Sequence, residues 1–115
     1  MITRKNDMPV DVKVAMRGGN GTVELTSFAT PEELNNKGRL FANITLKPGC
    51  GIGYHVHENE TEMFYFAAGA GKVCDDGEWY DIAAGDSMTT PGGHGHAVEN
   101  TGDTDLVLVA VIVLD

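Results

Sequence analysis

The chain has 115 residues, 42% of them apolar and 22% charged, and a formal net charge of −9. These values are typical of one globular domain that buries a core of its own. The acidic balance argues against nucleic acid and anionic membrane surfaces as partners, because both attract basic proteins, and no stretch of about 18 apolar residues predicts a membrane-spanning helix.

The N-terminal part of the chain carries no motif of known chemistry, but its pattern predicts two strands. Residues 1–7 are polar and lead to no apolar segment, so we expect no signal peptide and a cytoplasmic location. Valines alternate with other residues across 10–16, the glycine-rich stretch 18–21 follows, and 22–28 alternates again. This arrangement indicates a β-hairpin. The glycines lack the Lys-Ser/Thr pair and the helix of a phosphate-binding loop.

A short helical turn and a long strand are predicted next. Thr30, the proline after it and Glu33 are typical of a helix start, and Gly38 would end this helix after a turn or two. Residues 39–46 alternate as a strand. Arg39 at its start could approach a pocket, but we favour a solvated strand end for this side chain.

The first of two histidine-centred blocks follows this strand. It consists of Gly49, His55, His57, Glu62 and Gly69. His55 and His57 point the same way along an extended backbone, because side chains alternate along a strand. The polar residues after His57 predict a turn, which would bring Glu62 back beside the histidines from the next strand of a hairpin.

Other residues near this block have competing roles. Glu58 and Glu60 compete with Glu62 for the role of carboxylate ligand, and we interpret both as solvated turn charges. Phe64 and Phe66 share a face with Glu62. They either line a pocket for a ligand or pack as ordinary core residues.

The second block comes after a predicted hairpin over residues 72–82, whose Asp-Gly turn joins two short strands. Residues 87–90 read as a further short strand. The block consists of Gly85, Pro91, Gly93, His96 and Asn100. His94 lies two residues before His96 and is an alternative ligand, a general base at the pocket mouth or a solvated turn residue. We favour the last of these roles for His94.

The last strand, residues 106–114, is apolar without alternation. Such a strand needs cover on both faces. One face can join the core, and the other would need the N-terminal hairpin or a partner subunit. The two cysteines, Cys50 and Cys74, have no neighbour at metal-site or redox-pair spacing, so we expect reduced thiols.

Three of the four histidines and one glutamate could converge on a single divalent ion. They are His55, His57, His96 and Glu62. Imidazole and carboxylate suit a transition metal, so we expect one divalent ion of Fe, Mn, Ni, Zn or Co. Four protein ligands leave part of an octahedral shell open for water or a ligand, unlike the closed, cysteine-rich sites of structural zinc.

The two blocks match the two conserved motifs of the cupins at every defining position, and the chain resembles a small single-domain cupin. The resemblance implies that His55, His57, Glu62 and His96 take the metal-ligand positions inside a small antiparallel β-barrel. It also adds weight to a homodimer, since cupins are often dimers.

We therefore expect an all-β fold, a double-stranded β-helix of jelly-roll type with at most one short helical turn. A single domain would span 1–115. Within it, 1–38 would form the N-terminal hairpin and the short helical turn, and 39–115 would form the barrel core with both motifs.

Two functions are compatible with this pattern. The first is a metal-dependent enzyme that acts on a small molecule as an isomerase, lyase, decarboxylase or dioxygenase, with the ion polarising substrate oxygens. The alternative is a non-catalytic module whose metal holds a small ligand or stabilises the barrel. A sugar-phosphate isomerase is disfavoured, because the pocket-facing strands offer few Lys or Arg residues to bind phosphate.

Overall fold

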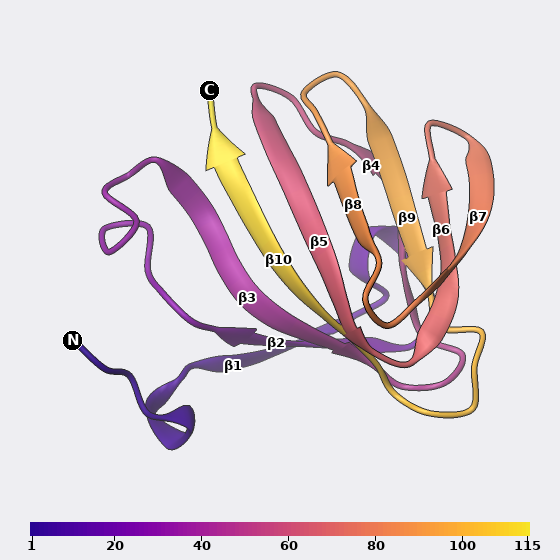
Figure 1. Ribbon diagram of the computed structural model, residues 1–115, viewed down its shortest axis with the longest axis horizontal. Helices are drawn as coiled ribbons and strands as arrows, with labels where there is room; N and C mark the ends of the chain where they lie inside the picture. The colour runs from indigo at the N-terminus through magenta and orange to yellow at the C-terminus, as the bar shows by residue number, and fades with distance from the viewer.

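The computed structural model describes residues 1–115 and consists almost entirely of antiparallel strands in two sheets (Figure 1). One sheet has six strands in the order β1-β2-β3-β10-β5-β8, and the other has four in the order β4-β9-β6-β7. The strands are β1 Val10–Val14, β2 Thr22–Ser27, β3 Gly38–Leu46, β4 Gly51–Val56, β5 Glu60–Ala68, β6 Ala70–Asp75, β7 Glu78–Ala83, β8 Ser87–Thr90, β9 Gly95–Glu99 and β10 Leu106–Leu114.

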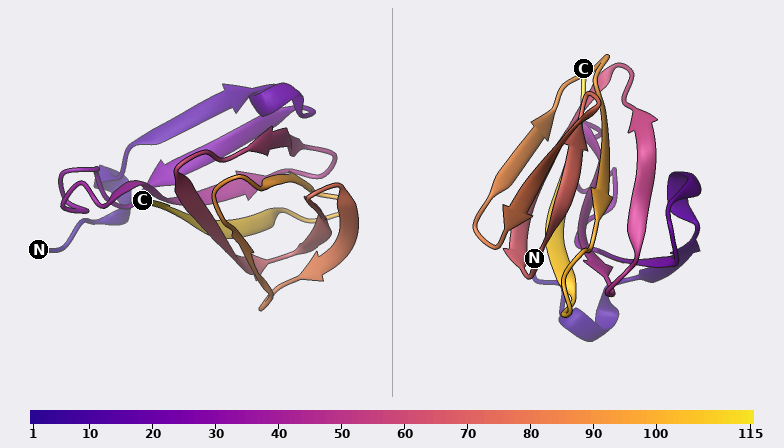
Figure 2. Two further views of the ribbon diagram at one scale, coloured as in Figure 1. Left: turned by 90° about the horizontal axis from the view of Figure 1, so that it is seen from above. Right: turned by 90° about the vertical axis from the view of Figure 1, so that its right-hand side faces the viewer.

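The two sheets face each other (Figure 2) and enclose one hydrophobic core. Phe66 and Leu108 enter it from the six-stranded sheet, and Ile52, Val73 and Val98 enter it from the four-stranded sheet. Alternation along β3, β5 and β10 sends every second side chain into this core. The expected all-β, jelly-roll class is confirmed by this arrangement.

The short helical turns lie elsewhere than expected. Single 3-10 turns form at η1 Lys5–Asp7 and η2 Met16–Gly18, whereas residues 31–36 form hydrogen-bonded turns. The predicted cap is present, because Thr30 and Glu33 exchange side chain–backbone hydrogen bonds of 3.0 and 3.1 Å. Asn35 and Asn36 then adopt left-handed φ values of 55° and 54°. The chain therefore leaves helical geometry before a helix can propagate.

A bulge in β4 decides which way the first histidine points. Ile52 pairs with Val98 and His55 pairs with His96, so two residues of β4 lie opposite one residue of β9. Strict alternation would put Ile52 and His55 on opposite faces. The extra residue re-aims the strand, and both side chains point into the barrel.

The N-terminal hairpin extends the six-stranded sheet at its edge and does not cover β10. Asp11 and Lys13 of β1 face inward over the barrel mouth. Val10, Val12 and Val14 point outward and are 58%, 56% and 76% exposed. The outer face of β10 is thus left without a second layer from the chain itself.

The structure contains no helix with the length and apolar character needed to cross a membrane.

Candidate metal centre

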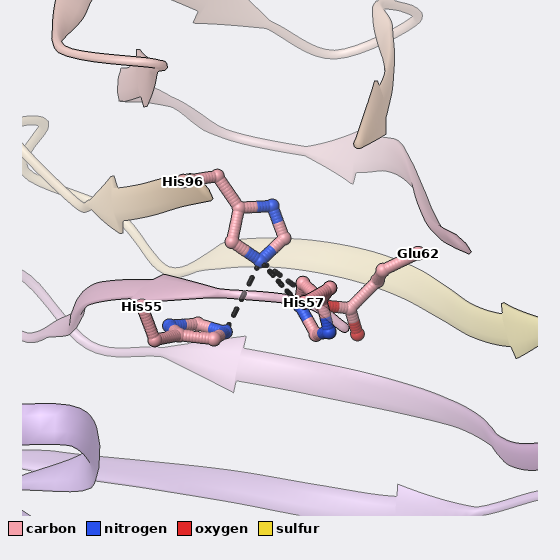
Figure 3. Close-up of side chains that lie close together, drawn as sticks. All are labelled: His55, His57, Glu62 and His96. Atoms are coloured by element: carbon pink, nitrogen blue, oxygen red, sulfur yellow. Dashed lines mark hydrogen bonds and ion pairs between the residues drawn. The ribbon is translucent and has the colours of Figure 1, made fainter. Parts of the chain in front are cut away.

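The four side chains singled out by their spacing point toward one another (Figure 3). His55 lies on β4, His57 directly after it, His96 on the paired strand β9, and Glu62 on β5 of the opposite sheet. One potential ligand atom from each residue lies within 4.8 Å of all the others. The cluster is thus assembled from both sheets and depends on the complete fold.

The atoms that meet are the three Nε2 nitrogens and one oxygen of Glu62. Nε2 of His96 is 3.0 Å from Nε2 of His57 and 3.2 Å from Nε2 of His55. Oε1 of Glu62 is 2.9 Å from Nε2 of His57 and 3.0 Å from Nε2 of His96. Ligands bound at about 2.1 Å and at right angles would be about 3.0 Å apart, so the spacing matches neighbouring positions of an octahedron.

The other nitrogen of each imidazole has its own partner. Nδ1 of His55 donates to the carbonyl oxygen of Gly53 at 2.8 Å, and Nδ1 of His57 donates to the carboxylate of Glu60 at 3.0 Å. Both partners accept only, so the proton of each ring resides on Nδ1 and Nε2 presents a lone pair. Nδ1 of His96 lies 2.8 Å from the hydroxyl of Thr90, which can accept in the same way.

This protonation pattern fits a cation between the four groups. Bare imidazole nitrogens and an ionised carboxylate are all acceptors, so no proton is left to join them at such short distances. His57, His96 and Glu62 are 3%, 1% and 5% exposed, which keeps water from screening their mutual repulsion. Nitrogen and carboxylate donors suit a divalent transition metal ion. Burial lowers the pKa of His55, and the neighbouring imidazoles and Arg17 act in the same direction, so this ring is neutral and able to bind metal at neutral pH.

Glu60 is part of this site, and its interpretation as a solvated turn charge is wrong. The carboxylate is buried and binds Arg39 through two hydrogen bonds as well as His57. The Arg39 guanidinium and the His57 ring lower the pKa of Glu60 to about 2 despite its burial. Glu60 shares the parity of Glu62 on β5, so extending the alternation one step towards the N-terminus would have found it.

Arg39 is exposed, as expected for a strand end, but its side chain also lines the cavity. Leu40 pairs with Ile112 and Gly38 pairs with Val113, so Arg39 is the extra residue of a bulge in β3. The bulge turns its side chain to the barrel mouth, where it binds Glu60. This ion pair raises the pKa of the guanidinium. A bulge leaves no clear sequence signal, so alternation alone does not predict the contact between Arg39 and Glu60.

The two phenylalanines proposed for the pocket have different positions. Phe64 stacks on the His96 ring, with centroids 4.9 Å apart and an interplanar angle of 15°. It also lines the cavity beside the cluster. Phe66 is 0% exposed and belongs to the core cluster. Of the two, Phe64 is therefore placed to contact a ligand.

A cavity of about 260 Å³ opens beside the cluster and is reached by His55, His57 and Glu62. Apolar side chains form half of its lining. Its rim carries the cationic residues Lys13, Arg17 and Arg39. The expectation of few cations near the pocket is thus wrong, because two of them come from the N-terminal hairpin, whose packing the motifs do not predict.

Three other features take no part in the cluster: His94, the two cysteines and a second cleft. His94 is half-exposed in the loop before β9, where its Nδ1 hydrogen-bonds the carboxylate of Asp76. Both cysteines are free, with Cys74 buried and Cys50 half-buried. A larger cleft of about 360 Å³ lies beside Tyr54 and Trp79 and contains none of the four clustered residues.

Residues 42–112 match the cupin domain family model. The chain belongs to the cupin family. It is 42% identical over 114 residues to a protein of Thermotoga maritima named oxalate-binding protein, with 99% of this chain and 94% of that protein covered.

The fold agrees with solved cupin structures. The crystal structure of a predicted oxalate decarboxylase from Thermotoga maritima superposes with a TM-score of 0.96 at 42% identity over 100% of both chains. A cupin domain from Schizosaccharomyces pombe superposes with a TM-score of 0.75 at 12% identity, covering 93% of this chain and 70% of the other. The second likeness concerns the fold alone.

Proposed function

We propose that the cluster binds one divalent transition metal ion and that the adjoining cavity uses this ion to bind a small carboxylate, with oxalate as the candidate ligand. The observation that carries the proposal is the convergence of three Nε2 lone pairs and one carboxylate oxygen at spacings of 2.9 to 3.2 Å. Fe, Mn, Ni, Zn and Co all suit this donor set, and the right-angled spacing favours an ion that accepts six ligands.

Two features support a small anionic ligand. The cavity of about 260 Å³ has room for a small molecule and has cationic residues on its rim. A relative that matches 99% of this chain is named oxalate-binding protein. A bound ion would act as a Lewis acid towards the oxygens of the ligand.

The residues of the chain have separate tasks in this proposal. His55, His57, His96 and Glu62 hold the ion and leave part of its shell open. Glu60 holds the proton of His57 on Nδ1, so that Nε2 stays free to bind. Phe64 and the apolar wall exclude water from the cavity, which strengthens the attraction between the ion and an anion.

Turnover of the ligand is the second candidate, supported by the neighbour described as a predicted oxalate decarboxylase. Decarboxylation breaks a carbon–carbon bond, and the carbon that stays must take up a proton. The buried acid next to the ligands, Glu60, has a pKa of about 2 and is ionised at neutral pH. Glu60 is thus not placed to supply this proton, and the relative that covers almost all of this chain is named for binding, so we favour binding over catalysis.

The test is to purify the protein anaerobically, measure its metal by mass spectrometry, and titrate it with oxalate by calorimetry. We expect one metal per chain and one oxalate per metal, without release of carbon dioxide. Release of carbon dioxide that disappears in His57→Ala would establish the enzyme instead. Oxalate binding to metal-free protein with unchanged affinity would contradict the proposal.

We also propose that the protein is a homodimer. The outer face of the six-stranded sheet carries Phe41, Met63 and Tyr65, which are 36%, 37% and 52% exposed, around the half-buried Val109 and Val111. A second copy would bury this apolar face. Light scattering should give twice the chain mass of 12.3 kDa, and a monomer at micromolar concentration would contradict the dimer.

A further inference from the structure

The N-terminal hairpin supplies part of the cavity wall, with Asp11, Lys13, Met16, Arg17 and Leu25. Its loop contains η2, which lies against β4, the strand that carries His55. A Cβ atom on Gly53 would overlap the carbonyl oxygen of Arg17, and one on Gly19 would overlap the carbonyl oxygen of Gly51. Such close backbone contact holds the backbone of Arg17 in place beside β4.

The backbone of Arg17 has an unfavourable conformation for a residue with a Cβ. Its φ and ψ are 54° and 27°, in the left-handed region, and Ala15 nearby has a φ of 51°. The loop contains glycines that could take these values more easily. Non-glycine residues persist there when the surrounding packing determines the conformation, and such positions concentrate at ligand sites.

The charges around the cavity leave one cation without a partner. Lys13 lies 3.0 Å from the carboxylate of Asp11, and Arg39 is bound to Glu60. Arg17 lines the cavity and forms no ion pair. It is therefore free to bind an anion that enters from solution.

The charge balance indicates what kind of anion this is. A divalent ion bound by neutral imidazoles and the single carboxylate of Glu62 keeps one net positive charge. Arg17 adds a second, because the other cations on the rim are already neutralised. A ligand with two negative charges matches this site better than a ligand with one.

We infer that Arg17 is the residue that selects small dicarboxylates: one carboxylate of the ligand would occupy the open positions on the metal, and the other would accept hydrogen bonds from the Arg17 guanidinium. This inference rests on the proposed metal site. Arginine suits the role, since its planar donors match a carboxylate. The N-terminal hairpin then determines which ligand the cluster receives.

The test compares oxalate with oxamate, a ligand of nearly the same shape in which an amide replaces one carboxylate. Both are titrated by calorimetry into manganese-loaded protein at 0.15 M salt, with affinities expressed per bound metal. The variants are Arg17→Gln, Arg17→Lys and the control Arg4→Gln. The control removes the same charge from a residue that does not line the cavity.

We expect Arg17→Gln to weaken oxalate binding about tenfold or more and to change oxamate binding by less than about threefold. Arg17→Lys should restore part of the loss, and Arg4→Gln should behave as wild type. Equal losses for oxalate and oxamate, or no loss for oxalate, would overturn the inference. Thermal unfolding of each variant shows whether the fold is kept.

Failure of the proposed function gives a different result. Wild-type protein that takes up no manganese at the cluster would contradict the metal site itself. Manganese-loaded wild type that binds neither ligand would contradict the proposed carboxylate binding. Wild-type protein that binds oxalate normally while Arg17→Gln binds it equally well contradicts only the role of Arg17.

Discussion

The cluster of candidate metal ligands and the N-terminal hairpin line the same cavity, but the cluster is mostly buried and the hairpin is largely exposed. The rings of His57 and His96 are almost fully buried, and each ligand imidazole is oriented by a hydrogen bond from Nδ1. Strand β1 of the hairpin lies at the edge of its sheet and has no buried residue. The proposed metal site therefore depends on the interior of the barrel, whereas the proposed ligand choice depends on an exposed loop of the hairpin.

The largest expected effect is loss of the metal when one of the buried ligand side chains is removed. His57→Ala deletes a nitrogen donor and leaves Glu60 and Glu62 without their shared partner. We expect the metal content, measured by mass spectrometry, to fall close to zero. His94→Ala is the matched control, because His94 lies outside the cluster. Equal metal loss in both variants would contradict the assignment.

The three glutamates near the first histidines should rank by their distance from the metal. Glu62→Gln removes a ligand charge and should weaken metal affinity most. Glu60→Gln removes the charge that orients His57, and we expect a loss of about 10- to 100-fold. Glu58→Gln changes an exposed residue and should have little effect. Competition with a metal-binding dye measures all three, and a greater loss in Glu60→Gln than in Glu62→Gln would reverse the assigned roles.

Gly53→Ala tests the contact between η2 of the hairpin loop and β4. The added methyl group would overlap the carbonyl oxygen of Arg17. Overpacking of this kind destabilises a fold by about 1–3 kcal/mol, which denaturant unfolding of the metal-free protein would detect. Gly102→Ala, away from the hairpin, is the milder comparison and should destabilise the fold less, since its Cβ would be 3.3 Å from the nearest atom whereas that of Gly53 would be 2.0 Å away. Unfolding free energies that agree between Gly53→Ala and wild type would show that the hairpin is not packed on β4 as described.

The smallest effect concerns the ion pair between His94 and Asp76, which lies outside both the cluster and the hairpin. Asp76 raises the pKa of His94, and His94 lowers the pKa of Asp76. The pair stabilises the fold between the ordinary pKa values of the two groups, from about pH 4 to about pH 6.5. The contribution is lost above this range as His94 deprotonates at its raised pKa, and below it as Asp76 protonates at its lowered pKa. In an NMR titration Asp76→Asn should return His94 to an ordinary pKa, and an unchanged titration would show that the pair is absent in solution.

The sequence predicts the four candidate metal ligands well and the position of the N-terminal hairpin poorly. His55, His57, Glu62 and His96 meet as the motif spacing indicated, because glycine and proline turns fix how their strands return. The Asp-Gly turn between β6 and β7 also forms as predicted, with Asp76 and Gly77 at positive φ values of 50° and 96°.

The missed features depend on contacts between distant parts of the chain. The bulge at Arg39 depends on pairing with β10, and the bulge in β4 depends on pairing with β9. The place of Arg17 at the cavity depends on the packing of η2 against β4. Alternation describes one strand at a time, so it cannot reveal where a strand gains an extra residue.

Anomalous X-ray scattering from crystals of the metal-loaded protein tests the central claim most directly. We expect one strong peak per chain, about 2.0–2.3 Å from each of the three Nε2 atoms and from the carboxylate of Glu62. A peak bound to other residues, or no peak at the cluster in protein that carries one metal per chain, would contradict the account.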